Sequence, residues 1–214
     1  MDIRRDFYLE KLIKRKSNGL IKVITGIRRC GKSYLLNNIF YHHLLDSGVE
    51  ADHIIRFAFD SADDLYLIGE SLIQIEKEKQ GVDPEKFMAY IRSKTTGEGI
   101  YYLLLAEIQM LDCFEAVLNG YLRKENIDVF VTGSNAKLLS KDIATEFAGR
   151  GDEIHMYPLS FAEFMSVYNG DKYTGLSDYM LYGGIPLVVL RDGAGDKATA
   201  LQTLFNDIYI RDIT

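Results

Sequence analysis

The chain has 214 residues, 47% hydrophobic and 26% charged, a composition that predicts a folded domain large enough to bury its own core. The two cysteines do not indicate a disulfide framework and favour a reducing compartment, and no stretch approaches the roughly 18 apolar residues of a membrane helix. The N-terminus also lacks the apolar core of a signal peptide, so we expect a cytoplasmic protein that does not associate with membranes.

The formal net charge of −6 is unevenly distributed, because residues 1–33 carry ten Lys and Arg against three Asp and Glu. Part of this basic excess lies on a helix expected over residues 6–16. Apolar side chains recur at helical spacing between the basic ones, which favours an amphipathic helix docked on a sheet with its basic face in water. Nucleic-acid binding through Lys14, Arg15 and Lys16 is the alternative.

A strand pattern over residues 20–25 is followed by a complete G-x-x-x-x-G-K-[ST] motif and then by a helical pattern to about residue 45. Glycines allow the backbone N–H groups to turn toward phosphate oxygens, and the helix that begins near Lys32 adds its positive N-terminal end. We expect Lys32 to reach the β- and γ-phosphates of ATP and the Ser33 hydroxyl to ligate Mg²⁺. The predicted nucleotide-binding residues are Gly26, Ile27, Arg28, Arg29, Cys30, Gly31, Lys32, Ser33 and Tyr34.

Strand and helix patterns alternate along the following chain, which predicts an α/β fold with a parallel sheet flanked by helices. Beyond residue 150 the pattern becomes mainly helical, and Ser160 with Glu163 forms a capping box. We therefore expect a P-loop core over residues 1–157 and a small helical, lid-like subdomain over residues 158–214. The expected strands are 53–59, 100–106, 127–132 and 153–157, and the expected core helices are 64–80, 84–94 and 112–125.

ATP hydrolysis requires a carboxylate that supports Mg²⁺ and a group that orients the attacking water. Glu107 follows the apolar strand of residues 100–106 and is our candidate for orienting the water. Ala106 occupies the position at which such a strand usually supplies aspartate, and losing a supporting metal ligand costs roughly 10–100-fold in affinity or activity. We expect retained nucleotide binding with weak or absent turnover. Asp60, at the end of the preceding strand, is a weaker candidate carboxylate.

Three further polar residues are candidates for roles in the reaction. Ser134 and Asn135 follow the strand of residues 127–132 and could sense the terminal phosphate, although a capped turn explains them equally well. Arg150 could act in trans as an arginine finger in a homo-oligomer, or could be an ordinary surface residue. Apart from the Mg²⁺ ligand Ser33, we expect no metal site.

Together these motifs resemble a family of bacterial and archaeal AAA+-like P-loop ATPases, most of them uncharacterised. The resemblance implies an additional-strand P-loop core and a longer protein with a further C-terminal domain of unknown function. Ala106 departs from the aspartate of that family. The matching segments are residues 25–33, 107–109, 132–135, 149–150, 158–164 and 183–186.

The function predicted from the sequence is an ATP-binding, Mg²⁺-dependent ATPase whose hydrolysis is weakened or abolished by Ala106. The alternative is a hydrolytically silent, nucleotide-gated switch module with a DNA or protein partner. A small-molecule P-loop kinase is disfavoured, because Glu107 stands in the water-activating position and no acceptor-binding cluster stands out.

Overall fold

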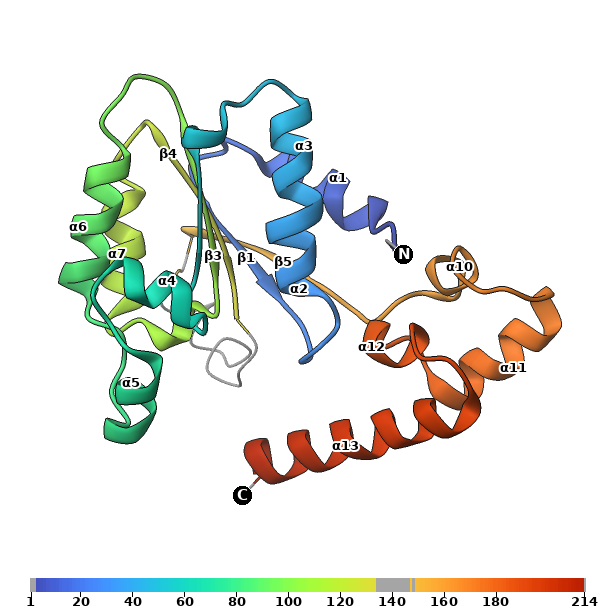
Figure 1. The fold of residues 1–214 in the computed structure, drawn as a ribbon. Helices are drawn as coiled ribbons and strands as arrows, with labels where there is room; N and C mark the ends of the chain where they lie inside the picture. The colour runs from blue at the N-terminus through green and yellow to red at the C-terminus, as the bar shows by residue number, and fades with distance from the viewer. Residues whose placement is uncertain (1–2, 134–146, 148, 214) are drawn as a thin grey trace. The chain divides into compact units, whose positions relative to one another are not determined.

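The computed structural model describes residues 3–133, 147 and 149–213, and within it the chain forms two compact units (Figure 1). The sheet unit consists of Phe7–Thr25 and Lys32–His155, and the helical unit consists of Met1–Asp6, Gly26–Gly31 and Met156–Thr214. The helical unit thus includes most of the glycine-rich loop. A domain boundary after residue 157 stays a prediction.

The sheet unit is built on five parallel strands in the order β2-β3-β4-β1-β5, which confirms the predicted fold class. Strand β4 lies between β1 and β3, so the strand before the glycine-rich loop and the strand before Glu107 are not neighbours. The central strands β1 and β3 are buried along their whole length, as expected for a sheet covered on both faces. The strands are β1 Ile21–Thr25, β2 Ile54–Ala58, β3 Tyr101–Ala106, β4 Ile127–Thr132 and β5 Gly151–His155.

Helices cover both faces of this sheet: α2, η1 and α3 lie on one side, and α4, α6 and α7 on the other (Figure 1). The main hydrophobic core of the unit contains side chains of α4, α5, α6 and α7 together with residues of β1 to β4. The helices of the unit are α1 Asp6–Arg15, α2 Lys32–Tyr34, η1 Leu35–Phe40, α3 Tyr41–Asp46, η2 Ala51–His53, α4 Ala62–Leu67, α5 Leu72–Glu78, α6 Pro84–Lys94, η3 Ile108–Met110 and α7 Phe114–Tyr121.

Two of these helices differ from the sequence prediction. The single helix expected over residues 64–80 was wrong, because α4 ends at Leu67 and α5 begins only at Leu72. Gly69 lies between them with φ of 72°, a conformation that suits glycine and interrupts a helix. The helix after the glycine-rich loop is continuous to Asp46, but its middle segment Leu35–Phe40 is a π-helix, which the hydrophobic pattern did not indicate.

The helical unit contains four helices after residue 156. The predicted capping box at the start of α10 is confirmed: Ser160 accepts from the Glu163 backbone N–H, and the Glu163 side chain accepts from the Ser160 backbone N–H. Within the described part of the chain, no helix combines the length and apolar character needed to cross a bilayer. The helices are α10 Phe161–Met165, α11 Lys172–Tyr182, α12 Pro186–Val189 and α13 Ala194–Ile213.

Candidate nucleotide-binding site

The glycine-rich loop begins directly after β1 and ends where α2 begins at Lys32. Three of its residues have positive φ: Gly26 at 137°, Arg29 at 62° and Gly31 at 100°. Residues of this kind interspersed in a turn direct successive backbone N–H groups toward one side and create an anion-binding concavity. The loop therefore has the local backbone character that a phosphate cradle requires.

Gly26 is needed for a close backbone approach. A Cβ atom at this position would lie 2.1 Å from the carbonyl oxygen of Met156, so no other residue fits without displacement of the main chain. Cys30 is fully buried, and its Sγ donates to the same carbonyl at 3.7 Å. This burial agrees with the sequence interpretation of Cys30 as a small space-filling side chain.

The residues of the loop fit a triphosphate with its magnesium ion. Lys32 is 5% exposed and is the first residue of α2, where the positive helix end adds to its own charge. Ser33 is exposed and therefore accessible to a metal ion, and Ile27 and Tyr34 are also exposed. The assignment of nucleotide contacts to these residues stays a prediction.

Strand β3 ends at the same edge of the sheet as β1, because all the strands are parallel. Ala106 is its last residue and is 2% exposed. Glu107 follows with φ of 55°, and a non-glycine residue in this region costs of order 1–3 kcal/mol. The Gln109 side-chain amide donates to the Glu107 carboxylate at 2.6 Å and fixes its orientation.

Asp60 lies close enough to Glu107 for their charges to interact. Partial burial raises the pKa of the Asp60 carboxyl group above its ordinary value, and the negative charge of Glu107 raises it further. The backbone accounts for this proximity, because the Phe59 N–H donates to the Ala106 carbonyl and continues the pairing of β2 with β3. Asp60 and Glu107 thus form an acidic pair at this edge of the sheet.

The end of β4 contributes a buried hydroxyl group. Thr132 is fully buried, and its Oγ1 has no hydrogen-bond partner within the described residues. A buried hydroxyl without a partner carries a desolvation cost, which a bound water or ligand would remove. The two residues predicted as phosphate sensors, Ser134 and Asn135, lie outside the described residues.

Arg150 lies at the amino ends of the parallel strands, opposite to the carboxyl ends where Glu107 lies. It directly precedes β5, and its carbonyl accepts from the N–H of Ile21, the first residue of β1. Its exposed guanidinium group donates to the Asn119 side chain at 3.2 Å. Because the strands are parallel, Arg150 and Glu107 of one chain lie at opposite ends of the strands. A role of Arg150 in trans stays a prediction.

Two basic side chains of α1, Lys14 and Arg15, have acidic partners in the sheet unit. Arg15 lies 2.8 Å from Asp152, and Lys14 lies 3.7 Å from Glu10 one helical turn earlier. This agrees with a helix docked on the sheet, and nucleic-acid binding through α1 stays a prediction.

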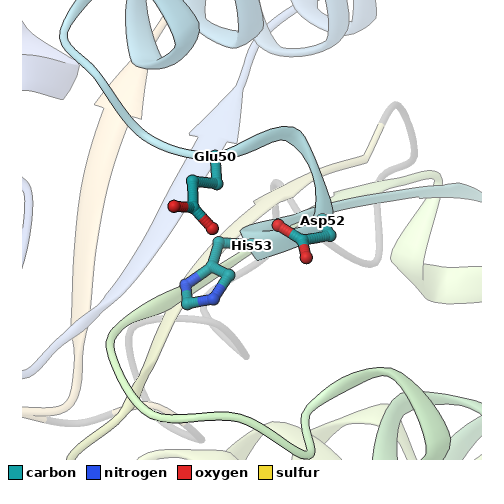
Figure 2. A group of neighbouring side chains, drawn as sticks. All are labelled: Glu50, Asp52 and His53. Carbon is teal, nitrogen blue, oxygen red and sulfur yellow. The ribbon is translucent and has the colours of Figure 1, made fainter.

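A separate polar group lies at the start of β2. Figure 2 shows Glu50, Asp52 and His53, whose potential metal-ligand atoms all lie within 4.8 Å of one another. The His53 ring also stacks on Tyr101, with ring centroids 4.3 Å apart, and its Nδ1 faces the Ile100 carbonyl at 3.2 Å. The two carboxylates are exposed, and exposed acidic groups commonly bind no ion, so we assign this group no ligand.

Sequence reasoning gave no role to Gln109 or Arg5. Gln109 could have been suspected only because it lies two residues after Glu107. Arg5 is buried and donates to the carbonyl of Cys30 inside the glycine-rich loop, although 25 residues separate the two in the chain. No pattern in the sequence indicates this contact.

The fold and the loop define an AAA+-like P-loop NTPase domain, and comparison with known proteins agrees. The family model described as AAA domain matches residues 18–165, so the chain belongs to this family. It is 37% identical over 219 residues to an uncharacterised protein of Haemophilus influenzae and 30% identical over 229 residues to one of Methanocaldococcus jannaschii. Both alignments cover 99% of this chain but only 50% and 44% of the relatives, so the chain spans about half their length.

Solved structures share the fold at low sequence identity. AMPPCP-bound DnaA of Aquifex aeolicus is 14% identical with a TM-score of 0.50, over 94% of this chain and 61% of that chain. The ORC1 protein of Aeropyrum pernix in complex with DNA is also 14% identical with a TM-score of 0.50, over 99% of this chain and 61% of that chain. At this identity the likeness establishes the fold and nothing further.

Proposed function

We propose that this chain binds ATP with Mg²⁺ at residues 26–33 and hydrolyses it slowly. The observation that carries the proposal is the complete motif between β1 and the helix that begins at Lys32, with three residues of the loop at positive φ. Both parts favour a phosphate ligand, because they gather N–H groups and positive charge at one place. The AMPPCP bound to DnaA, a relative in fold, makes ATP the first nucleotide to test.

Each residue of the site has a role in this proposal. The loop N–H groups bind and orient the phosphates, Lys32 compensates their charge, and the Ser33 hydroxyl holds the metal. When bound, Mg²⁺ neutralises charge on the β- and γ-phosphate oxygens. Glu107, oriented by Gln109, positions the attacking water, and Thr132 is the candidate hydroxyl beside the terminal phosphate.

The slow turnover follows from Ala106. Its methyl group is buried at the end of β3 and cannot accept a hydrogen bond from a metal-bound water. Asp60 is the weaker candidate for the missing carboxylate, and burial together with the charge of Glu107 raises the pKa of its carboxyl group. The second candidate function, a hydrolytically silent nucleotide switch, is favoured by the same alanine.

Calorimetry with Mg-ATP tests the binding step, and heat of binding at micromolar to millimolar ATP is expected. A folded protein that shows no binding at millimolar ATP would refute the proposal. Turnover of the Ala106→Asp variant then separates the two candidates. A clear gain supports an impaired ATPase, and tight binding without any gain supports the silent switch.

The proposal also includes the association of several copies of the chain. We place Arg150 as an arginine finger acting in trans between copies of the chain, and ATP-dependent association seen by analytical ultracentrifugation is the expected result. Turnover in a mixture of Arg150→Ala and Glu107→Gln proteins, each inactive alone, would support the role in trans. Association with DNA is tested by salt-dependent affinity that disappears when Lys14, Arg15 and Lys16 are neutralised.

A further inference from the structure

A buried arginine that the proposed function does not use lies just before α1. The side chain of Arg5 is 3% exposed, and its guanidinium group contacts three segments of the helical unit. Nη1 donates to the Cys30 carbonyl at 3.2 Å, Nη2 donates to the Tyr157 carbonyl at 2.7 Å, and Nε lies 3.0 Å from Oε1 of Glu163. The planar guanidinium thus donates two hydrogen bonds to backbone carbonyls and forms an ion pair with a carboxylate, although Nε makes no hydrogen bond within the described residues.

The contact with Cys30 fixes the orientation of one peptide group in the glycine-rich loop. In a planar trans peptide the C=O of one residue and the N–H of the next point in opposite directions. Because Arg5 binds the Cys30 carbonyl, the N–H of Gly31 is directed away from Arg5. That N–H is one of the loop donors that the proposed function assigns to the phosphates.

The contact with Glu163 connects the loop to helix α10. Oε2 of Glu163 accepts from the Ser160 backbone N–H at 2.8 Å and from the Ser160 hydroxyl at 2.9 Å, while Oε1 faces Arg5. One carboxylate thus closes the N-terminus of α10 and holds the arginine. Both side chains are largely removed from water, so the pair is poorly screened and either member alone would be left with an uncompensated charge.

We infer that Arg5 is a positioning residue for the phosphate loop: it sets the direction of the Gly31 N–H and couples the loop to α10 through Glu163. The inference rests on the proposed function, since it assigns the Gly31 N–H to a phosphate group. Arg5 itself reaches no phosphate in this scheme and acts only through the loop backbone.

Three variants test this inference in a graded way. Arg5→Met removes all donors but keeps an apolar chain, Arg5→Lys keeps the charge but loses the fork, and Glu163→Gln keeps a capping side chain but loses the ion pair. We expect Arg5→Met to weaken Mg-ATP binding about tenfold or more, as the loss of a charge-assisted hydrogen bond does. Arg5→Lys and Glu163→Gln should weaken it less, with Kd raised at least threefold.

Arg15→Met is the matched control. It removes another arginine–carboxylate pair, Arg15 with Asp152 at 2.8 Å, which belongs to the sheet unit, whereas residues 26–31 belong to the helical unit. We expect this variant to lower the melting temperature modestly and to leave the Kd for Mg-ATP unchanged. All Kd values are compared well below the lowest melting temperature, so that a purely structural role of Arg5 would leave them unchanged.

A second readout needs no nucleotide. Amide hydrogen exchange of Gly31, measured by NMR in the nucleotide-free protein, should accelerate in Arg5→Lys and Glu163→Gln relative to wild type and Arg15→Met. If Arg5→Met does not fold, these two milder variants decide the question. Kd values and Gly31 exchange equal to wild type in both would overturn the inference. If wild type itself binds no Mg-ATP, the proposed function is refuted. The amide hydrogen-exchange rate of Gly31 in the variants still tests whether Arg5 positions the loop.

Discussion

Two buried lysines, Lys22 in β1 and Lys32 at the start of α2, lie in different electrostatic surroundings. Lys22, the second residue of β1, is fully buried; it forms an ion pair with Asp128 of β4 and donates to the Leu20 carbonyl at 2.7 Å. Its ammonium group also lies 4.7 Å from the centre of the Phe130 ring. Burial lowers the pKa of Lys22, and Asp128 partly opposes this shift.

Lys32 is nearly as buried, but positive charge is concentrated around it in the sequence. Arg28 and Arg29 precede it, and it is the first residue of a helix, where the peptide dipoles add a positive partial charge. The comparison teaches that a lysine inside the sheet must be neutralised by the protein, while a lysine at the edge of the parallel strands can be neutralised by an anionic ligand. The first is part of the fold and the second is part of the site.

The largest effect is expected when the acidic partner of Lys22 is removed, which tests whether Lys22 must be neutralised by the protein. Asp128→Ala leaves a buried ammonium group uncompensated and also removes the acceptor for the Ser17 N–H at 2.8 Å. We expect the free energy of unfolding to fall by about 3–5 kcal/mol in urea denaturation. The double variant Lys22→Met with Asp128→Asn should recover most of the loss, and a single variant as stable as wild type would contradict the structural role of the pair.

The second prediction concerns the other lysine. Lys32→Ala should weaken Mg-ATP binding by about 100-fold in calorimetry, because a preorganised cation is lost from the phosphate site. The free energy of unfolding without nucleotide should change by much less than in Asp128→Ala. If stability fell as far and the folded protein kept its ATP affinity, Lys32 would be a structural residue like Lys22, and the comparison would fail.

The third prediction concerns the roles of Ala106 and Glu107 at the end of β3. Ala106→Asp should raise the rate of ATP hydrolysis about 10–100-fold and leave the Kd for ATP within a factor of a few. Adding Glu107→Gln to this variant should abolish the gain, because the amide cannot act as the base that positions water. Turnover that survives in the double variant would exclude Glu107 as the group that activates water.

The smallest expected effect is that of Asp60 on pH dependence. Its pKa is raised in the folded protein, so the folded state holds this proton more tightly than the unfolded state does. Its contribution to stability is therefore greatest at low pH and is lost as pH rises from its ordinary value of 3.8 through the raised value. Asp60→Asn should flatten the stability profile in that window in urea titrations at several pH values. A profile that stays identical to wild type would show that the pKa of Asp60 is not raised in the folded protein.

Features encoded by neighbouring residues could be predicted from the sequence. The loop over residues 26–33, the apolar run that becomes β3 and the capping box at Ser160 each depend on side chains within a few positions. The sequence also showed that Ala106 replaces the usual aspartate, because this position is defined by the strand before it and by Glu107 after it. The break between α4 and α5 was missed although its signal, Gly69, is local, because a single glycine inside a helical pattern is often tolerated.

By itself the sequence determined the class of the fold and the phosphate-binding motif, since both follow from short-range patterns of apolar, glycine and basic residues. The tertiary structure alone decided that β4 separates β1 from β3, that Asp128 neutralises Lys22, and that Arg5 lies against a loop carbonyl. Arg5 also binds the Tyr157 carbonyl across 152 residues of chain. The physical reason is that periodicity tells which face of an element is buried, while the partner of a buried charge depends on how distant segments are brought together.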